Sequence, residues 1–238
     1  MPADLISVIL IVRNGERFIR QALNSIFAQS YRSIEVLVID GHSSDTTCAI
    51  VAEFPQARLI PQVGQGIPHA YNTGLDHAQG DYIAFLSHDD LWMPDKLAQQ
   101  IAVLQADPEL AFVTCHARYF REAHVVVPAS FKQHLLERDV PVRNMEALLA
   151  RRQVFQDLGR FDERYATAED VDFFARAKDA GLRHQVLPEV LLQRRIHDAN
   201  SSLRDAQQNS AYLLRIMRES LLRQRSARAD APKNSDEG

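Results

Sequence analysis

The sequence predicts an α/β protein whose mostly parallel sheet is flanked by helices. Short apolar runs rich in β-branched residues are typical of strands buried on both faces. Segments with helical spacing of apolar residues separate these runs. Polar loops follow several of the runs directly. This alternation indicates parallel strands joined by crossover helices.

The first half of the chain carries the clearest pattern. Residues 6–12 read ISVILIV and residues 34–39 read IEVLVI, both as buried strands. We expect further strands at 57–61 and 81–86, and helices at 16–29, 46–54, 67–78 and 94–106. Polar loops follow the strands at 13–14, 40–45 and 87–90. Ligands of such sheets bind beyond the carboxyl ends of the strands, so we expect the site in these loops.

The second half is less regular. We expect strands at 110–120, 124–127 and 190–196, and helices at 144–156, 169–180 and 209–225. The residues from 226 onward are polar and are predicted to be disordered. We therefore predict one domain over 1–203, with halves at about 1–108 and 109–203, then an amphipathic helix over 204–225 and a tail over 226–238.

Composition sets the broad class of the protein. The 238 residues are 46% hydrophobic, which is enough for a full core. The net charge of -4, with Lys and Arg spread along the chain, argues against a nucleic-acid partner. Cys48 and Cys115 lack metal-ligand spacing and suit a reducing compartment. We see neither a signal peptide nor an apolar run of the ~20 residues that span a bilayer, so we predict a cytoplasmic protein.

Asp89 and Asp90 follow the strand expected at 81–86. Adjacent carboxylates repel each other and are costly to bury, and a divalent cation relieves both effects. Mg²⁺ or Mn²⁺ commonly uses one or two carboxylates together with substrate phosphates. Taken alone, however, the pair is more typical of the start of a helix before Pro94.

Other carboxylates have the same two interpretations. Asp40 ends a predicted strand and can accept hydrogen bonds from a ligand there. Glu169 and Asp170 open a predicted helix, where acidic residues favour the helix dipole. Alternatively, one of these two carboxylates takes a proton from a substrate hydroxyl.

Together the motifs resemble family 2 glycosyltransferases of the GT-A fold. The resemblance covers about residues 7–202 and depends on the order of its motifs. These are SVILIVRNGERFIRQALNSIFAQSY, EVLVIDGHSSDTT, GQGIPHAYNTGLDHAQGDYIAFLSHDDLWMPDKL, GRFDERYATAEDVDFFARA and LLQRRIHDANSS.

The resemblance implies an inverting transfer of sugar from a nucleoside-diphosphate sugar to an acceptor hydroxyl. Asp170 matches the general base of the family, with Glu169 beside it. Asp90 and His197 match ligands of a divalent Mn²⁺ or Mg²⁺ ion. The donor contacts implied are Ile11, Val12, Arg13, Asn14, Asp40, Gly66, His88, Asp89 and Arg195.

Some positions depart from the commonest family pattern. Gly41 and Ser87 stand where many relatives have Asp, and Arg13 stands where Tyr is frequent. These departures leave the nucleobase and sugar of the donor open. As an isolated loop histidine, His88 is expected to face solvent. His42, His69 and His77 are interpreted as non-catalytic.

Two alternative functions follow from the same residues. A sugar-1-phosphate nucleotidyltransferase also uses a nucleotide-binding sheet and a metal, but the loop after its first strand is usually rich in glycine. A non-catalytic nucleotide-sugar binding protein is the other alternative, and the intact carboxylates argue against it. The basic amphipathic helix over 209–225 suits packing on the domain, a homodimer or an anionic membrane.

Overall fold

The computed structural model describes residues 4–122, 125, 133–197, 200 and 206–230. The strands are β1 (Ile6–Val12), β2 (Ile34–Asp40), β3 (Ala57–Pro61), β4 (Tyr82–Ser87), β5 (Leu91–Trp92), β6 (Phe112–Arg121), β7 (Val140–Pro141), β8 (Leu149–Arg151) and β9 (His184–Ile196). The helices are α1 (Ile19–Phe27), α2 (Thr47–Ala52), α3 (Ile67–His77), α4 (Lys96–Ala106), α5 (Arg152–Asp157), α6 (Glu169–Asp179) and α8 (Ala206–Asp230), with short 3₁₀ turns η1 (Gln133–Leu136) and η2 (Met145–Ala147).

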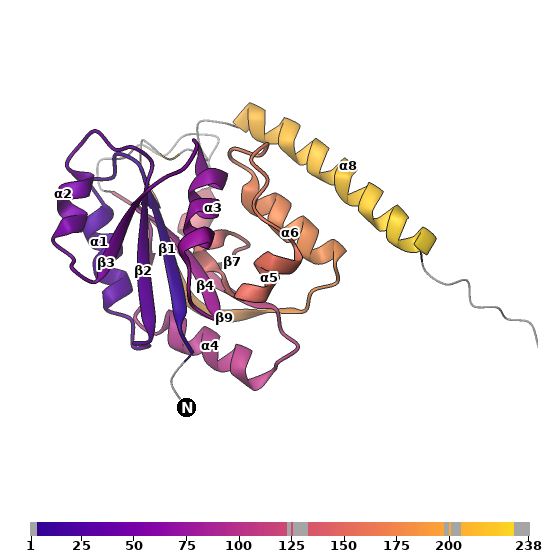
Figure 1. Ribbon diagram of the computed structural model, residues 1–238, viewed down its shortest axis with the longest axis horizontal. Coiled ribbons are helices and arrows are strands. Elements are labelled where there is room, and N and C mark those ends of the chain that lie inside the picture. Colours follow the sequence, from indigo (N-terminus) through magenta and orange to yellow (C-terminus); the bar gives the residue numbers. More distant parts are fainter. Residues whose placement is uncertain (1–3, 123–124, 126–132, 198–199, 201–205, 231–238) are drawn as a thin grey trace, which may run out of the picture.

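One mixed sheet organises the molecule (Figure 1). Its order is β3-β2-β1-β4-β8-β6-β9-β5, with β7 beside β6. The first four strands are parallel, as predicted. The strand order reverses at β1, because the chain adds β2 and β3 on one side of β1 and β4 on the other. In α/β sheets this reversal opens a crevice at the carboxyl ends of the strands.

Alternating side chains of β1 explain why its whole sequence is apolar. Val8 and Leu10 belong to the core under α1, α2 and α4. Ile9 and Ile11 belong to the core under α3, α5 and α6. All seven residues of the strand are buried, which confirms a sheet covered on both faces.

The helix predicted over 144–156 is confirmed only from 152 onward. The chain instead forms η2, then β8, then α5. Leu149 pairs with Ala84 of β4 and with Val113 of β6, so β8 fills the space between two longer strands. Within β8, Leu149 and Ala150 are both fully buried. Sheet pairing therefore overrides the helical spacing of the apolar residues.

The boundaries of other strands and helices also differ from those predicted. β9 starts at His184 rather than at 190, because its first residues pair with β6. α8 continues to Asp230, five residues into the predicted tail, and the remainder of that tail lies outside the described residues. Of the strand predicted at 124–127, only Val125 is described, and it is not in a strand.

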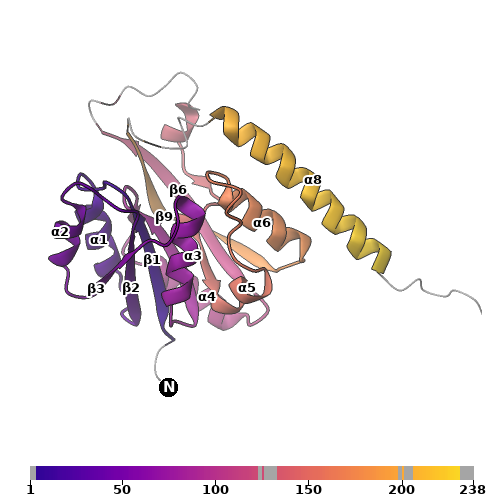
Figure 2. The ribbon, with the colours of Figure 1, turned by 45° about the horizontal axis from the view of Figure 1, so that its top comes forward.

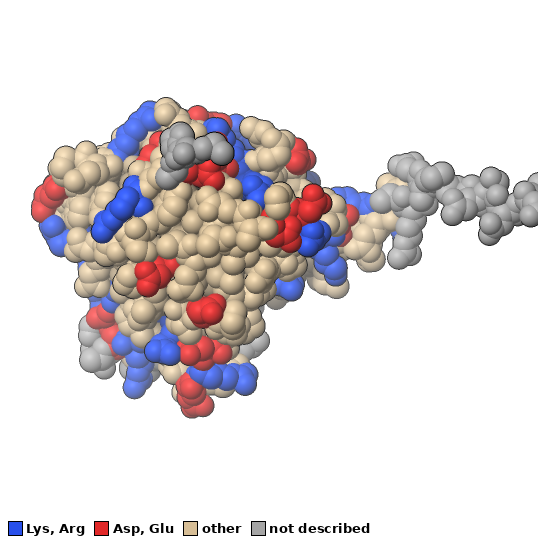
Figure 3. Space-filling view, turned by 90° about the horizontal axis from the view of Figure 1, so that it is seen from below, with Lys and Arg blue, Asp and Glu red and all other residues tan. Residues whose placement is uncertain are grey.

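α8 runs along α6 at the edge of the molecule (Figure 2). No helix among the described residues has the length and apolarity needed to cross a membrane. Acidic and basic side chains are interspersed on the face shown in Figure 3. The cytoplasmic location stays a prediction.

Lys96 is fully buried in the core beneath the second half of the sheet. Its Nζ donates to Gln100 Oε1 at 2.8 Å and lies 4.3 Å from the centre of the Trp92 ring. Burial lowers the pKa of Lys96 from 10.5 to about 8. Between these two pKa values the unfolded chain binds more protons than the folded protein, so this residue makes the free energy of unfolding rise with pH.

Lys96→Met is expected to remove that rise. From about pH 7.5 to about pH 9.5, the wild type should gain about 2 kcal/mol relative to the variant. Urea unfolding at each pH measures the free energy of unfolding of both proteins. The difference between the two proteins cancels the titration of the other groups. Parallel pH curves for the two proteins would contradict a lowered pKa of Lys96.

Candidate active site

A cavity of about 690 Å³ lies at the carboxyl ends of β1, β2 and β4. Its size falls in the range of small-molecule sites. Of the residues predicted from sequence, the cavity is lined by Ile11, Val12, Arg13, Asn14, Gly66, His88, Asp89 and His197. Sequence reasoning did not assign Gly41, His42, Gln62, Gly64, Gln65, Ile67, Ala70 and Ser87, which also line it.

Two of the lining loops are bonded to each other. Asn14 donates its backbone N–H to Ser43 Oγ at 2.8 Å, and its Oδ1 accepts from the backbone N–H of Ser44 at 2.8 Å. Asn14 and His42 have positive φ angles of 51° and 61°. Residues other than glycine rarely adopt this backbone conformation. It persists where surrounding contacts enforce it, often at binding sites.

His88 packs against the backbone of the first loop. A Cβ atom added to Gly15 would lie 2.6 Å from the His88 ring, so glycine is required for this approach. Burial lowers the pKa of His88, which favours the neutral ring. The expectation that His88 faces solvent is therefore wrong.

Asp89 and His197 form a pair on the cavity wall. His197 Nε2 lies 2.9 Å from Asp89 Oδ2, and both residues line the cavity. The pair joins the loop after β4 to the segment after β9. Burial on its own raises the pKa of Asp89, but the hydrogen bond with His197 and the charge of Arg194 help to lower the pKa below its usual value. Asp89 therefore presents an ionised carboxylate to the cavity.

The spacing of this pair suits a divalent cation. Octahedral ligands at about 2.1 Å from Mg²⁺ lie about 3 Å apart when they are neighbours. The 2.9 Å between Asp89 Oδ2 and His197 Nε2 is close to that separation, and a cation bound there would replace the hydrogen bond between these two atoms. The described residues contain no group of three or more His, Cys, Asp or Glu side chains that could hold a metal ion. Other ligands would have to come from a bound molecule such as a diphosphate.

Asp90 points away from the cavity. It is 2% exposed, and its Oδ1 accepts from the backbone N–H of Arg195 at 2.9 Å. Its Oδ2 lies 3.3 Å from Arg194 Nε. Burial raises the pKa of Asp90, while Arg194 opposes that shift. The geometry makes Asp90 a residue that holds β9 beside the β4 loop, whereas Asp89 faces the cavity.

Two residues predicted to contact the donor lie behind the cavity wall. Asp40 is buried, and its carboxylate accepts from the backbone N–H of Ser43. Arg195 donates to the backbone oxygen of Asp89 at 3.0 Å and to Gln21 Oε1 at 2.6 Å. Neither residue lines the cavity, and their hydrogen bonds hold the loops that do.

A second acidic group contains the candidate base. Asp170 is at the start of α6, where its Oδ1 accepts from the backbone N–H of Val171 at 2.7 Å. Burial and the charge of Glu146 raise the pKa of Asp170 to about 6. Burial and the charge of Asp170 raise the pKa of Glu169 well above its usual value. Glu169 Oε2 is buried and has no hydrogen-bond partner among the described residues.

Glu146 is the residue that sequence reasoning missed here. Its Oε1 accepts from Ser87 Oγ at 2.6 Å, which links it to the cavity wall. Its backbone oxygen accepts from Trp92 Nε1 at 2.9 Å, which fixes the η2 turn. The charges of Glu146 and Asp170 act on each other, so Glu146 bridges the cavity and the base. No local motif marks it, because its role depends on contacts that are distant in sequence.

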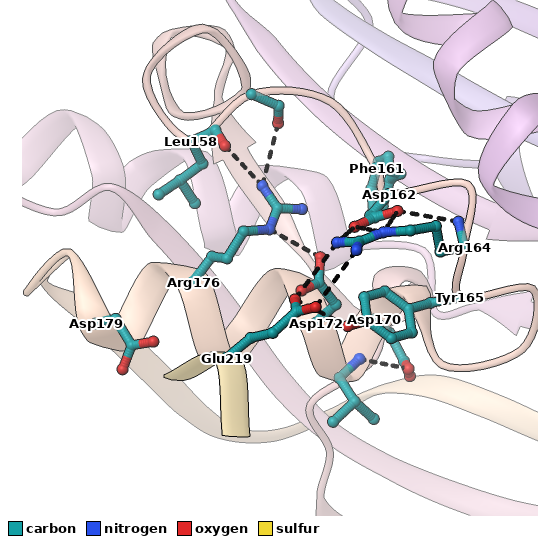
Figure 4. A network of polar contacts seen from close by, with 12 residues as sticks. Leu158, Phe161, Asp162, Arg164, Tyr165, Asp170, Asp172, Arg176, Asp179 and Glu219 are labelled. Atoms are coloured by element: carbon teal, nitrogen blue, oxygen red, sulfur yellow. Dashed lines mark hydrogen bonds and ion pairs between the residues drawn. The ribbon is translucent and has the colours of Figure 1, made fainter. Parts of the chain in front are cut away.

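The start of α6 is held from outside by a polar network (Figure 4). Asp172 receives Arg176 Nε at 2.8 Å, and Arg176 Nη1 donates to the backbone oxygen of Leu158 at 2.7 Å. The Tyr165 hydroxyl donates to Glu219 of α8 at 2.9 Å. These contacts fix the helix that carries Asp170.

A mixed sheet whose first four strands are parallel, with a cavity at the reversal of strand order, is the architecture of the GT-A class. Two solved structures share this fold. The mannosyltransferase PcManGT from Pyrobaculum calidifontis, in complex with GDP-Man and Mn²⁺, has a TM-score of 0.65 and 26% identity, over 82% of this chain and 58% of that one. TarS residues 1–349 from S. aureus, in complex with UDP, has a TM-score of 0.64 and 22% identity, over 80% of this chain and 60% of that one.

The sequence itself matches the family described as Glycosyl transferase family 2 over residues 7–180. The chain belongs to this family. An uncharacterized glycosyltransferase of Rickettsia typhi is 28% identical over 84% of the chain and 66% of its own length. The Escherichia coli enzyme WfgD, a UDP-Glc:alpha-D-GlcNAc-diphosphoundecaprenol beta-1,3-glucosyltransferase, is 39% identical over 42% of the chain and 41% of its own length. The chain thus spans less than two thirds of these relatives.

Proposed function

We propose that this protein transfers a sugar from a nucleoside-diphosphate sugar to an acceptor hydroxyl. The observation that carries the proposal is the ionised Asp89 beside His197 on the wall of a cavity at the reversal of strand order. Family membership and neighbours that bind UDP or GDP-Man support the same donor class. Family membership also favours sugar transfer over a sugar-1-phosphate nucleotidyltransferase or a non-catalytic nucleotide-sugar binding protein.

Asp89 and His197 would hold a divalent cation, Mn²⁺ or Mg²⁺, together with the donor diphosphate. A cation bound there supplies positive charge that offsets the charge of the departing diphosphate. A neighbour of this fold holds Mn²⁺ together with its donor, which supports the assignment. The nucleobase would lie along the loops of Arg13 and His42.

Asp170 is the general base of the proposed reaction. Its pKa of about 6 leaves it ionised at neutral pH yet basic enough to take a proton from a hydroxyl. The acceptor oxygen attacks the anomeric carbon as the bond to the diphosphate breaks, and Asp170 Oδ receives the hydroxyl proton. A single displacement of this kind inverts the anomeric configuration. Burial also raises the pKa of the adjacent Glu169 well above its usual value, so the two carboxyl groups differ in basicity.

A thermal-shift panel of nucleoside diphosphates and their sugars tests the donor class. A ligand at 100 times its Kd should stabilise the protein by about 2.7 kcal/mol, which raises Tm by about 5 to 10 °C in a chain of this size. The shift should be larger with Mn²⁺ than with a chelator. The absence of a shift with every nucleotide, with or without Mn²⁺, would reject the donor assignment, and an equal shift with chelator would reject the metal.

A further inference from the structure

One face of α8 is fixed on the domain. Ile216 is 2% exposed and packs in a small apolar cluster against Tyr165. Ser220 Oγ and Arg223 Nε each donate to the Asp179 carboxylate at 2.8 Å. Asp179 lies at the end of α6 that is remote from Asp170 (Figure 4). Contacts spread along the helix set its rotation, so its opposite face must point outward.

That opposite face is apolar. Leu214, Met217 and Leu221 are 71%, 62% and 55% exposed. Their spacing of three and four residues places them along one stripe of the helix. Leu213, 42% exposed, adjoins the stripe. Among the described residues, eight large hydrophobic side chains are exposed, and five of these are on α8.

Positive charge lies beside the stripe. Arg218 follows Leu214 by four residues and Arg225 follows Leu221 by four, so both arginines are on the outward side. The sequence of α8 holds five arginines and two acidic residues, a net charge of +3 in a chain whose net charge is -4. The helix is therefore basic where the rest of the protein is acidic.

We propose that the outer face of α8 binds the surface of a lipid bilayer that contains anionic headgroups. The helix would lie in the plane of the interface, with Leu214, Met217 and Leu221 inserted between headgroups. A rigid apolar stripe next to arginines is the arrangement by which amphipathic helices bind such surfaces. The arginines attract anionic lipid within about one Debye length.

A second copy of the chain fits this face less well. Two α8 helices meeting on their stripes would bring Arg218 and Arg225 of both copies together, which is repulsive. A stable interface uses about 20–30 residues a side, far more than this stripe offers.

This placement has a geometric consequence. α8 packs on α6, and α6 begins with Glu169 and Asp170. A bilayer against α8 would therefore lie beside the half of the domain that carries the candidate base. Binding to lipid needs neither donor nor acceptor, so its test is separate from that of sugar transfer.

Cosedimentation with vesicles tests the proposal on the full chain. We expect binding to vesicles of phosphatidylcholine mixed with phosphatidylglycerol, weaker binding to phosphatidylcholine alone, and loss of the difference in high salt. Leu214→Glu with Leu221→Glu should weaken binding by about tenfold or more, since each leucine contributes buried apolar area. Leu59→Glu, on β3, is the matched control and should bind as the wild type does.

A second pair of variants keeps the test independent of folding. Arg218→Gln with Arg225→Gln preserves the stripe and should reduce binding only to the anionic vesicles. Thermal melts check that each variant folds. The proposal is overturned if the wild type does not sediment with anionic vesicles. It is also overturned if the leucine pair and Leu59→Glu have equal effects, or if light scattering shows a dimer that the leucine substitutions disperse.

Discussion

Asp170→Asn is expected to lower kcat by about 10²- to 10⁴-fold while the affinity for the donor stays unchanged. Asparagine has nearly the shape of aspartate and can still accept from the backbone N–H of Val171, so the start of α6 should keep its structure. It cannot take a proton from the acceptor hydroxyl. Turnover with a saturating acceptor, together with calorimetric titration of the donor, measures both halves of this expectation.

The pH profile provides the control for that experiment. Asp170 acts when ionised, so kcat/KM should fall as pH drops below about 6, the pKa that burial and Glu146 give it. Glu146→Gln keeps an oxygen that can accept from Ser87 but removes the negative charge, so the acidic limb should move to lower pH. Near-normal turnover of Asp170→Asn would refute the assignment of Asp170 as the general base, whatever the pH profile shows.

The first half of the fold was predictable because three of its strands, β1, β2 and β4, are largely buried on both faces. A run such as ISVILIV has one interpretation, since alternate residues enter separate cores. The second half lacks this redundancy. β8 has only three residues, too few for Leu149 and Ala150 to show a pattern typical of a strand. They form a strand because they pair with β4 on one side and β6 on the other. Local sequence does not encode that pairing.

The location of the site was predictable for a similar reason. Carboxyl ends of parallel strands meet at one edge, so the loops after β1, β2 and β4 had to converge. The roles of individual residues were not predictable. Adjacent residues such as Asp89 and Asp90 point in opposite directions, and which one faces the cavity depends on how the loop closes. Glu146 enters the site from a turn 59 positions away from Ser87.

Comparison of Asp89→Asn with Asp90→Asn decides which carboxylate serves the metal. Asp89→Asn should weaken Mn²⁺-dependent binding of a nucleoside diphosphate by about 10- to 100-fold, because the ionised ligand is lost from the cavity wall. Its Tm should change little. Calorimetric titrations with Mn²⁺ and with chelator should then give similar affinities.

Asp90→Asn should show the opposite pattern. Asparagine leaves Arg194 without its ionic partner, so the free energy of unfolding should fall by about 2 kcal/mol. Nucleotide binding measured well below the lowered Tm should still respond to Mn²⁺. If instead Asp90→Asn lost its response to Mn²⁺ at an unchanged Tm, Asp90 would be the metal ligand that the sequence motif predicts. The assignment of that role to Asp89 would then be wrong. A carboxylate that accepts from Arg195 N–H at 2.9 Å and pairs with Arg194 would have to exchange both contacts for the cation, and that cost argues for Asp89.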